Sequence, residues 1–332
     1  MTTEARYDIV AVGNAIVDVI AQADDSFLEE EQLAKGAMTL IDAERATELY
    51  RDMGPAREIS GGSGSNTLAG ASTLGRQCAL IAQVADDQLG EVFTHDIRAT
   101  GIDFDVPPLG KEPPTARCLI FVTPDAQRTM NTFLGASQFL PPSSVDADLI
   151  ASGAILYLEG YLWDADEPKA AMALAMDIAR KNGRKVAFTL SDGFCIMRHR
   201  DEFAKLIADG KIDILFSNED EIMSLCETDD FDGAVEQTAA QVETLVVTRS
   251  EKGAIAVQDG QRVSVAAEPV DKIVDTTGAG DLFAAGFLSG YTEGRSVEDS
   301  LTIGAIAAAE VISHYGARPE ADIRAMVEER LG

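Results

Sequence analysis

Short apolar segments recur along this chain, and their spacing limits its fold more than any other feature. Each segment has the length of one buried β-strand. They occupy residues 7–13, 78–84, 154–158, 185–190, 212–216 and 244–248. Alanine-rich stretches with apolar residues at helical spacing, such as residues 167–182, lie between several of them. Strands that alternate with helices in this way predict an α/β fold, in which helices sandwich a mostly parallel sheet.

Two segments interrupt this alternation. Residues 15–41 and about 103–133 contain short strand-like runs broken by proline and glycine, among them an apolar run at 115–122. We interpret these segments as a small β-strand lid beside the main sheet, with ordinary edge strands of that sheet as the alternative. No linker rich in proline, glycine or serine divides the chain, so a single domain over residues 1–332 is expected.

Acidic residues outnumber basic ones by 56 to 27, which gives a formal net charge of −29. A surface of this charge repels phosphate backbones and anionic lipid, so nucleic-acid and membrane partners are disfavoured. No run of roughly 18 apolar residues is present that could span a membrane. The four cysteines lie far apart and fit neither a zinc site nor a dense disulfide framework, so we expect a reducing, cytoplasmic location.

The strongest chemical signal is the heptapeptide at residues 275–281, which an apolar helix is expected to follow. Gly278, Ala279 and Gly280 leave backbone amides exposed at the start of that helix, where unpaired N–H groups and the helix dipole bind anions. Asp281 cannot bind a phosphate of like charge, but it can accept a proton from an attacking hydroxyl. The pattern therefore indicates phosphoryl transfer to an alcohol, with a plain helix cap and a tight turn as the alternative.

As a whole, the heptapeptide resembles the C-terminal signature of the ribokinase-like (PfkB) kinase superfamily. Other phosphate loops do not fit, because the chain has no Walker motif and no Gly-x-Gly-x-x-Gly that opens a helix. The resemblance covers nearly the whole chain. It implies the ribokinase-like fold and an enzyme, a phosphotransferase with an alcohol group as acceptor, whose cofactors are ATP and Mg²⁺.

The family's acceptor-binding elements have counterparts in the first part of the chain. The segment 61–67 resembles the Gly-Gly-x-x-x-Asn motif, and Gly13-Asn14 followed by Asp18 resembles the element whose acid binds vicinal ribose hydroxyls. By this resemblance, the acceptor contacts are Asn14, Asp18, Gly62 and Asn66. A polar turn after a strand is the alternative for Asn14 and Asp18.

The nucleotide-binding elements have counterparts in the second part of the chain. Asn218 and Glu221 match the Asn-x-x-Glu element, in which the glutamate reaches magnesium through water. A simple helix cap is the alternative. Thr248 and Gly253 resemble part of a nucleotide-binding turn, although Ser250 replaces its first glycine.

Two further nucleotide contacts follow from the same resemblance. Thr277 belongs to the heptapeptide, and Gly316 lies in the segment 312–317 that should flank the adenine. Many relatives also hold potassium at the residue that corresponds to Asp275. The resemblance leaves open whether this chain binds K⁺.

Within the superfamily, the closest resemblance is to adenosine kinases. The Gly-Asn-x-x-x-Asp spacing at 13–18 and the segment 189–194 carry it. Arg128 lies where such kinases place an arginine that clamps phosphate; an exposed lid charge is the alternative. Leu134 and Phe194 are expected either to form an apolar purine pocket or to belong to the core.

The expected reaction is ATP-dependent phosphorylation of the adenosine 5′-hydroxyl to give AMP, with Asp281 as general base. The acceptor is thus a small molecule, a nucleoside or a sugar. A sugar kinase acting on ribose, fructose or a keto-deoxy sugar acid is the alternative within the superfamily. A regulatory protein that binds nucleoside or ATP without catalysis is the alternative from another class. Exposed lid strands pair with a second copy in some proteins, so a monomer and a homodimer both remain open.

Overall fold

A computed structural model describes residues 5–125 and 127–332, and within these ranges the chain forms one sheet of nine strands and one of five. The nine-stranded main sheet has the order β14-β13-β12-β11-β10-β9-β1-β5-β6. Neighbouring strands run parallel from β12 to β6, and only β13 and β14 are antiparallel. Its strands are β1 (Tyr7–Val12), β5 (Cys78–Ile81), β6 (Ile102–Phe104), β9 (Gly153–Glu159), β10 (Lys185–Thr189), β11 (Ile214–Asn218), β12 (Thr244–Thr248), β13 (Ala254–Gln258) and β14 (Gln261–Val265).

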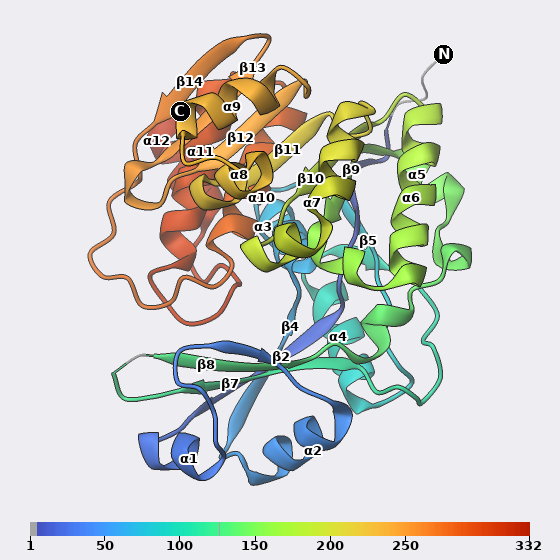
Figure 1. Cartoon of the computed structure of the whole chain (residues 1–332), viewed down its shortest axis with the longest axis vertical. Helices are drawn as coiled ribbons and strands as arrows, with labels where there is room; N and C mark the ends of the chain where they lie inside the picture. Colours follow the sequence, from blue (N-terminus) through green and yellow to red (C-terminus); the bar gives the residue numbers. More distant parts are fainter. Residues whose placement is uncertain (1–4, 126) are drawn as a thin grey trace.

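Each of the six predicted apolar segments overlaps a strand of the main sheet, so the predicted α/β architecture is confirmed (Figure 1). The helices are α1 (Asp25–Glu30), α2 (Ala43–Asp52), α3 (Ser63–Thr73), α4 (Gln88–Ala99), α5 (Ala147–Ser152), α6 (Asp166–Lys181), α7 (Gly193–Ala208), α8 (Glu219–Cys226), α9 (Phe231–Ala239), α10 (Ala279–Thr292), α11 (Val297–Val311) and α12 (Ile323–Leu331). None of the described helices has both the length and the hydropathy needed to cross a bilayer.

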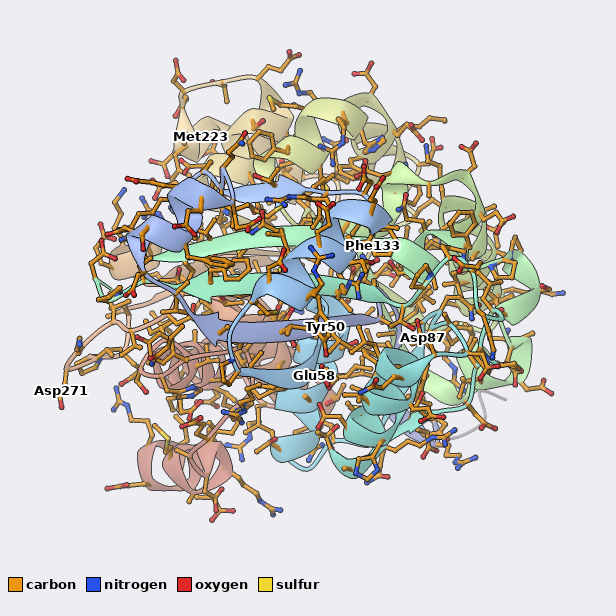
Figure 2. The ribbon with its side chains drawn as sticks, turned by 90° about the horizontal axis from the view of Figure 1, so that it is seen from below. Tyr50, Glu58, Asp87, Phe133, Met223 and Asp271 are labelled. Atoms are coloured by element: carbon orange, nitrogen blue, oxygen red, sulfur yellow. The ribbon has the colours of Figure 1, made fainter. Side chains whose placement is uncertain are left out.

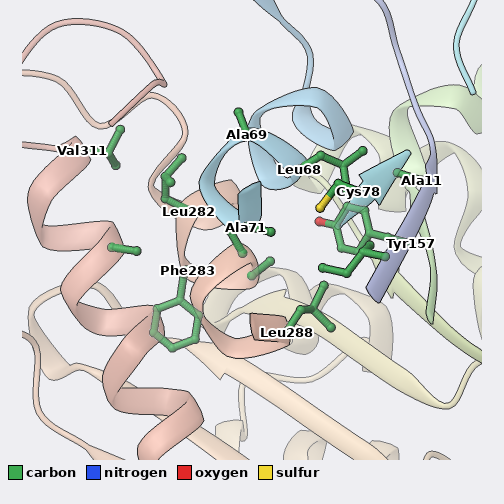
Figure 3. Packing of buried hydrophobic residues seen from close by; sticks show 14 of the residues in the cluster. Ala11, Leu68, Ala69, Ala71, Cys78, Tyr157, Leu282, Phe283, Leu288 and Val311 are labelled. Atoms are coloured by element: carbon green, nitrogen blue, oxygen red, sulfur yellow. The ribbon is translucent and has the colours of Figure 1, made fainter. Parts of the chain in front are cut away.

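Side chains alternate between two hydrophobic clusters, one on each face of the main sheet. Along β1, Ile9 and Ala11 join the first cluster, whereas Val10 and Val12 join the second. Helices α1 to α4 and α10 to α12 supply the first cluster, and α5 to α9 supply the second. Figure 3 shows the first cluster where α3 and α10 meet, with Ala71 beside Leu282. This packing fixes the starts of α3 and α10 at the same edge of the sheet.

The five-stranded sheet, called the small sheet below, lies beside the main sheet and has the order β3-β8-β7-β2-β4. Its strands are β2 (Ile16–Gln22), β3 (Met38–Leu40), β4 (Ala56–Gly61), β7 (Ala116–Val122) and β8 (Arg128–Phe133). Four of these strands fall in the two segments assigned to a lid. β4 comes from outside both segments, and β6, which begins just before the second segment, belongs to the main sheet. Residue 126 of the second segment, like residues 1–4, lies outside the described residues.

The two faces of the small sheet have different surroundings. Val19 and Phe121 point to the first cluster, on the side that α1 and α2 cover (Figure 2). The opposite face, here called the inner face, carries a separate apolar cluster. Its members are Ile16, Ile20, Cys118, Ile120, Val122 and Met130. Asp18 lies between Ile16 and Ile20 on β2 and therefore shares the inner face.

Candidate active site

The start of α10 presents amides that the protein leaves unpaired. Among the described residues, no group accepts a hydrogen bond from the amides of Gly278, Gly280 or Asp281, while the Ala279 amide donates to the Thr276 carbonyl at 3.3 Å. Gly278 has φ +75°, and a Cβ there would lie 2.5 Å from the Cβ of Ala317. Only glycine tolerates both conditions. The loop before α10 thus holds free N–H groups at the positive end of the helix dipole, as an anion site requires.

The carboxylate of Asp281 lies beside these amides and is held by two side chains from α3. Its Oδ1 accepts a hydrogen bond from Ser63 Oγ at 2.6 Å, and its Oδ2 accepts one from Asn66 Nδ2 at 3.0 Å. Burial raises the pKa of Asp281, and the hydrogen bonds from Ser63 and Asn66 oppose this rise. Asn66 Oδ1 is buried without a partner among the described residues, so it can accept a hydrogen bond from a bound hydroxyl.

The two glycines of the Gly-Gly motif lie directly against Asn14 and Asp18. A Cβ at Gly61 would lie 2.5 Å from Asp18 Oδ2. Gly62 has φ +97°, and a Cβ there would lie 2.3 Å from the Asn14 carbonyl oxygen. The structure therefore brings Asn14, Asp18 and Gly62 together at the junction between the two sheets. The hydrogen bond from Asn66 to Asp281 joins this group to the start of α10.

A buried glutamate at the end of β9 accepts hydrogen bonds from residues at the same junction. Glu159 Oε1 accepts hydrogen bonds from the Asn14 amide at 3.1 Å and from Asn14 Nδ2 at 2.5 Å, and Oε2 accepts one from the Gly64 amide at 2.5 Å. Burial raises the pKa of Glu159 to about 7, and these hydrogen bonds oppose the rise. We did not predict this residue, although an acid that directly follows the apolar run 154–158 was a usable signal.

Arg318 is a second residue that sequence reasoning missed. From the loop before α12, its Nη1 donates to the Ser65 carbonyl at 2.7 Å, and its Nη2 donates to the Ser60 carbonyl at 2.7 Å. Burial lowers the pKa of Arg318 to about 10. Its positive charge lowers the pKa of both Asp18 and Asp281. No motif identifies this arginine, because its partners lie more than 250 positions away in the sequence.

Arg128 forms an ion pair with Asp275, with 2.9 Å between Nη2 and Oδ1. The arginine side chain is only 15% exposed, so the alternative of a solvent-exposed lid charge is wrong. Asp275 also accepts hydrogen bonds from the amide of Thr277 at 2.8 Å and from that of Gly316 at 3.0 Å. The heptapeptide, the small sheet and the C-terminal loop are thus joined at one carboxylate.

The predicted nucleotide contacts lie along the carboxyl edge of the main sheet. Asn218 caps α8, and the Glu221 carboxylate accepts hydrogen bonds from the Asn218 amide at 3.0 Å and from its Nδ2 at 2.7 Å. Burial raises the pKa of Glu221 to about 7. Thr248 ends β12. Thr277 Oγ1 is buried and unpartnered within the described part of the chain.

The structure shows the surroundings of three further predicted contacts. A Cβ at Gly253 would lie 2.1 Å from the Val265 carbonyl oxygen, so close backbone packing alone accounts for this glycine. Phe194 is 63% exposed at the start of α7, so its alternative assignment to the core is wrong. Leu134 itself is partly buried after β8.

The buried carboxylate of Asp18 on the inner face makes the stability of the protein depend on pH. Burial raises the pKa of Asp18 to about 7, against the opposing charges of Arg318 and Arg128. The folded protein therefore binds a proton that the unfolded chain has already released, and stability falls as the pH rises from about 4 to about 7. Asp18→Asn removes this loss, so it should be more stable than the unaltered protein at pH 8 and lose this advantage near pH 4.

Urea unfolding of both proteins across this pH range measures the effect. Asp201→Asn, at an exposed position on α7, is the control. A gap between Asp18→Asn and the unaltered protein that stays constant with pH would contradict the assignment.

Comparison with known proteins agrees with this geometry. The family model described as "pfkB family carbohydrate kinase" matches residues 7–324. The adenosine kinase from Sinorhizobium meliloti is 51% identical, with a TM-score of 0.91 over 98% of this chain and 100% of that one. A probable sugar kinase from Rhizobium etli is 49% identical, with a TM-score of 0.92 over 98% and 99% of the two chains.

Among curated proteins, a 5-dehydro-2-deoxygluconokinase from Bacillus licheniformis is 27% identical over 99% of this chain and 97% of its own length. The family match covers nearly the whole chain and includes both the amides of α10 and the carboxylate beside them. The chain therefore belongs to the pfkB family of carbohydrate kinases, phosphotransferases that act on hydroxyl groups.

Proposed function

We propose that this protein transfers the γ-phosphoryl group of ATP to the 5′-hydroxyl of adenosine, with Asp281 as the general base. One observation carries the proposal. A single helix start combines unpaired amides with a carboxylate that two α3 side chains orient. The amides stabilise charge on the migrating phosphoryl group, and the carboxylate takes the proton of the hydroxyl that attacks it. A pKa raised by burial makes Asp281 a stronger base than an exposed aspartate.

The residues at the sheet junction would hold the acceptor. Asn66 Oδ1, buried and unpartnered in the described structure, would accept a hydrogen bond from a ribose hydroxyl, and Asp18 would bind the vicinal hydroxyls. Asn14 would contribute its side-chain oxygen Oδ1, because its backbone amide and its Nδ2 already donate to Glu159. These contacts would present the 5′-hydroxyl to Asp281, a matter of positioning that accounts for much of phosphoryl-transfer catalysis.

The apolar inner face favours a nucleoside over a sugar. Ile16 and Ile20 flank Asp18 on β2, and Cys118 and Ile120 lie on the neighbouring strand. An apolar surface next to a carboxylate suits a ligand with a flat base on one side and a ribose on the other. A sugar acid fits less well, because Asp18 and Asp281 repel a third carboxylate and Arg318 already donates to backbone carbonyls.

The nucleotide would bind across the carboxyl edge of the main sheet, as ligands of open parallel sheets generally do. Thr277 Oγ1 and the α10 amides would hold the phosphates, with Thr248, Gly253 and Gly316 along the rest of the nucleotide. Magnesium, when bound, neutralises charge on the phosphates. Glu221 would reach it through water, because no three His, Cys, Asp or Glu side chains gather at a metal-binding spacing in the described residues. The small sheet would act as the lid that excludes competing water.

Sugar phosphorylation is the second candidate. It is favoured by the 49% identity to a probable sugar kinase and by the match to 5-dehydro-2-deoxygluconokinase. Assays of ADP release with adenosine, ribose, fructose and 5-dehydro-2-deoxygluconate decide between the two. We expect adenosine to give the highest kcat/KM. Background turnover of adenosine beside turnover of a sugar would transfer the assignment to that sugar.

Asp281→Asn should lower kcat by about 10²- to 10⁴-fold, because the hydroxyl loses its general base. Asp299→Asn is a matched control, since Asp299 occupies the same third position of α11. An Asp281 that served only the helix terminus would give the same small effect as Asp299. Near-normal turnover of Asp281→Asn would show that Asp281 is not the general base.

Glu159→Gln should raise the KM of the acceptor by about 10- to 100-fold, because Asn14 and Gly64 lose charge-assisted hydrogen bonds. The KM of ATP should change little. Glu310→Gln is the comparison, since Glu310 is the buried carboxylate that accepts from the amides of Glu320 and Ala321 in the C-terminal loop. Initial rates with each substrate varied in turn separate the two constants. Equal increases in both constants for Glu159→Gln would show that this residue maintains the fold rather than the acceptor site.

A further inference from the structure

We propose that the Arg128 guanidinium is a built-in counter-ion of Asp275 and that it replaces the monovalent cation that family resemblance implies at this carboxylate. Asp275 lies within the loop that leads into α10, and only 2% of its side chain is exposed. The only ion pair that the described residues give to Asp275 is the one with Arg128. The proposal concerns cation binding, and only its kinetic test rests on the proposed function.

The groups around Asp275 do not fit a potassium ion. Both carboxylate oxygens face donors, with Oδ1 accepting from the Thr277 amide and Oδ2 from the Gly316 amide. Arg128 Nη2 lies 2.9 Å from the same Oδ1. A potassium ion needs a shell of oxygen ligands. Here the full positive charge of Arg128 already occupies the space beside the carboxylate and would repel the ion.

A cation at this point has a physical purpose. The amides of Gly278 and Gly280 are free to bind an anion, but an uncompensated carboxylate a few residues away would repel that anion. A buried carboxylate without a partner is also strongly destabilising. Guanidinium stays protonated at every physiological pH and forms directional hydrogen bonds, so it neutralises Asp275 permanently.

The counter-ion also belongs to a different part of the fold from its carboxylate. Arg128 is the first residue of β8 in the small sheet, whereas Asp275 precedes α10 on the main part. Asp275 is therefore neutralised only when the small sheet lies in the position seen here. An exchangeable ion from solution would not link the two.

Thermal unfolding in potassium chloride and in tetramethylammonium chloride, at equal ionic strength, tests the proposal without any turnover. The unaltered protein should melt at the same temperature in both salts. Arg128→Gln should melt at a lower temperature, and potassium should then raise its melting temperature by roughly 2–4 °C, because the vacated carboxylate can bind the ion. Arg128→Lys keeps the charge and should not respond to potassium.

Arg57→Gln is the matched control. Arg57, on β4 of the small sheet, pairs with Glu320 of the C-terminal loop at 3.8 Å, but this pair is exposed. Its variant should behave like the unaltered protein in both salts. Stabilisation of the unaltered protein by potassium would overturn the proposal, and so would an Arg128→Gln protein that does not respond to potassium.

A kinetic test accompanies the melting experiment. Turnover of the unaltered protein should be the same in the two salts, and a requirement for potassium would overturn the proposal. If adenosine proves not to be the acceptor, the melting experiment still decides the role of Arg128, so failure of the one proposal is distinguishable from failure of the other.

Discussion

The unpaired amides at the start of α10 are the constraint on which the rest of the site depends. A helix start always leaves N–H groups without partners, and most proteins satisfy them with a capping side chain. Here the cap is Gly278, which has no side chain to offer. Close packing of Gly278 on Ala317 keeps the loop in place without filling the position in front of the amides. The fold thus leaves these N–H groups without acceptors, and a bound anion supplies them.

Negative charge is concentrated around this anion site, and the protein balances it with arginines from distant segments. Burial raises the pKa of Asp18, Glu159 and Asp281, which shows how costly their ionisation is. Arg318 approaches from the C-terminal loop and Arg128 from the small sheet. Each arginine also connects two separate parts of the chain. The same two arginines therefore balance the negative charge and hold separate parts of the fold in their relative positions.

The sequence predicted those parts of the structure that local pattern determines. The apolar runs predicted six of the nine strands of the main sheet, and the small residues of the heptapeptide marked the start of α10. Pairings between distant segments could not be predicted from local sequence pattern. β4 has a polar, half-exposed sequence and becomes a strand only because it pairs with β2. Glu159 and Arg318 belong to no motif, since their importance lies in contacts that exist only after folding. The sequence left both a purine pocket and the core open for Phe194, and only folding shows that this side chain lies outside the core.

The connection between the two sheets has a mechanical consequence. β1 of the main sheet continues into β2 of the small sheet through residues 13–15 alone, and Glu159 fastens Asn14 within that connection. The chain also crosses between the sheets at the same end of β4, β7 and β8. Any rotation of the small sheet must turn about this row of connections, so displacement grows with distance from it. Asp18, early in β2, would move little, while residues farther along the strands would move farthest. Local chain stiffness at these connections therefore limits how far the whole sheet can swing.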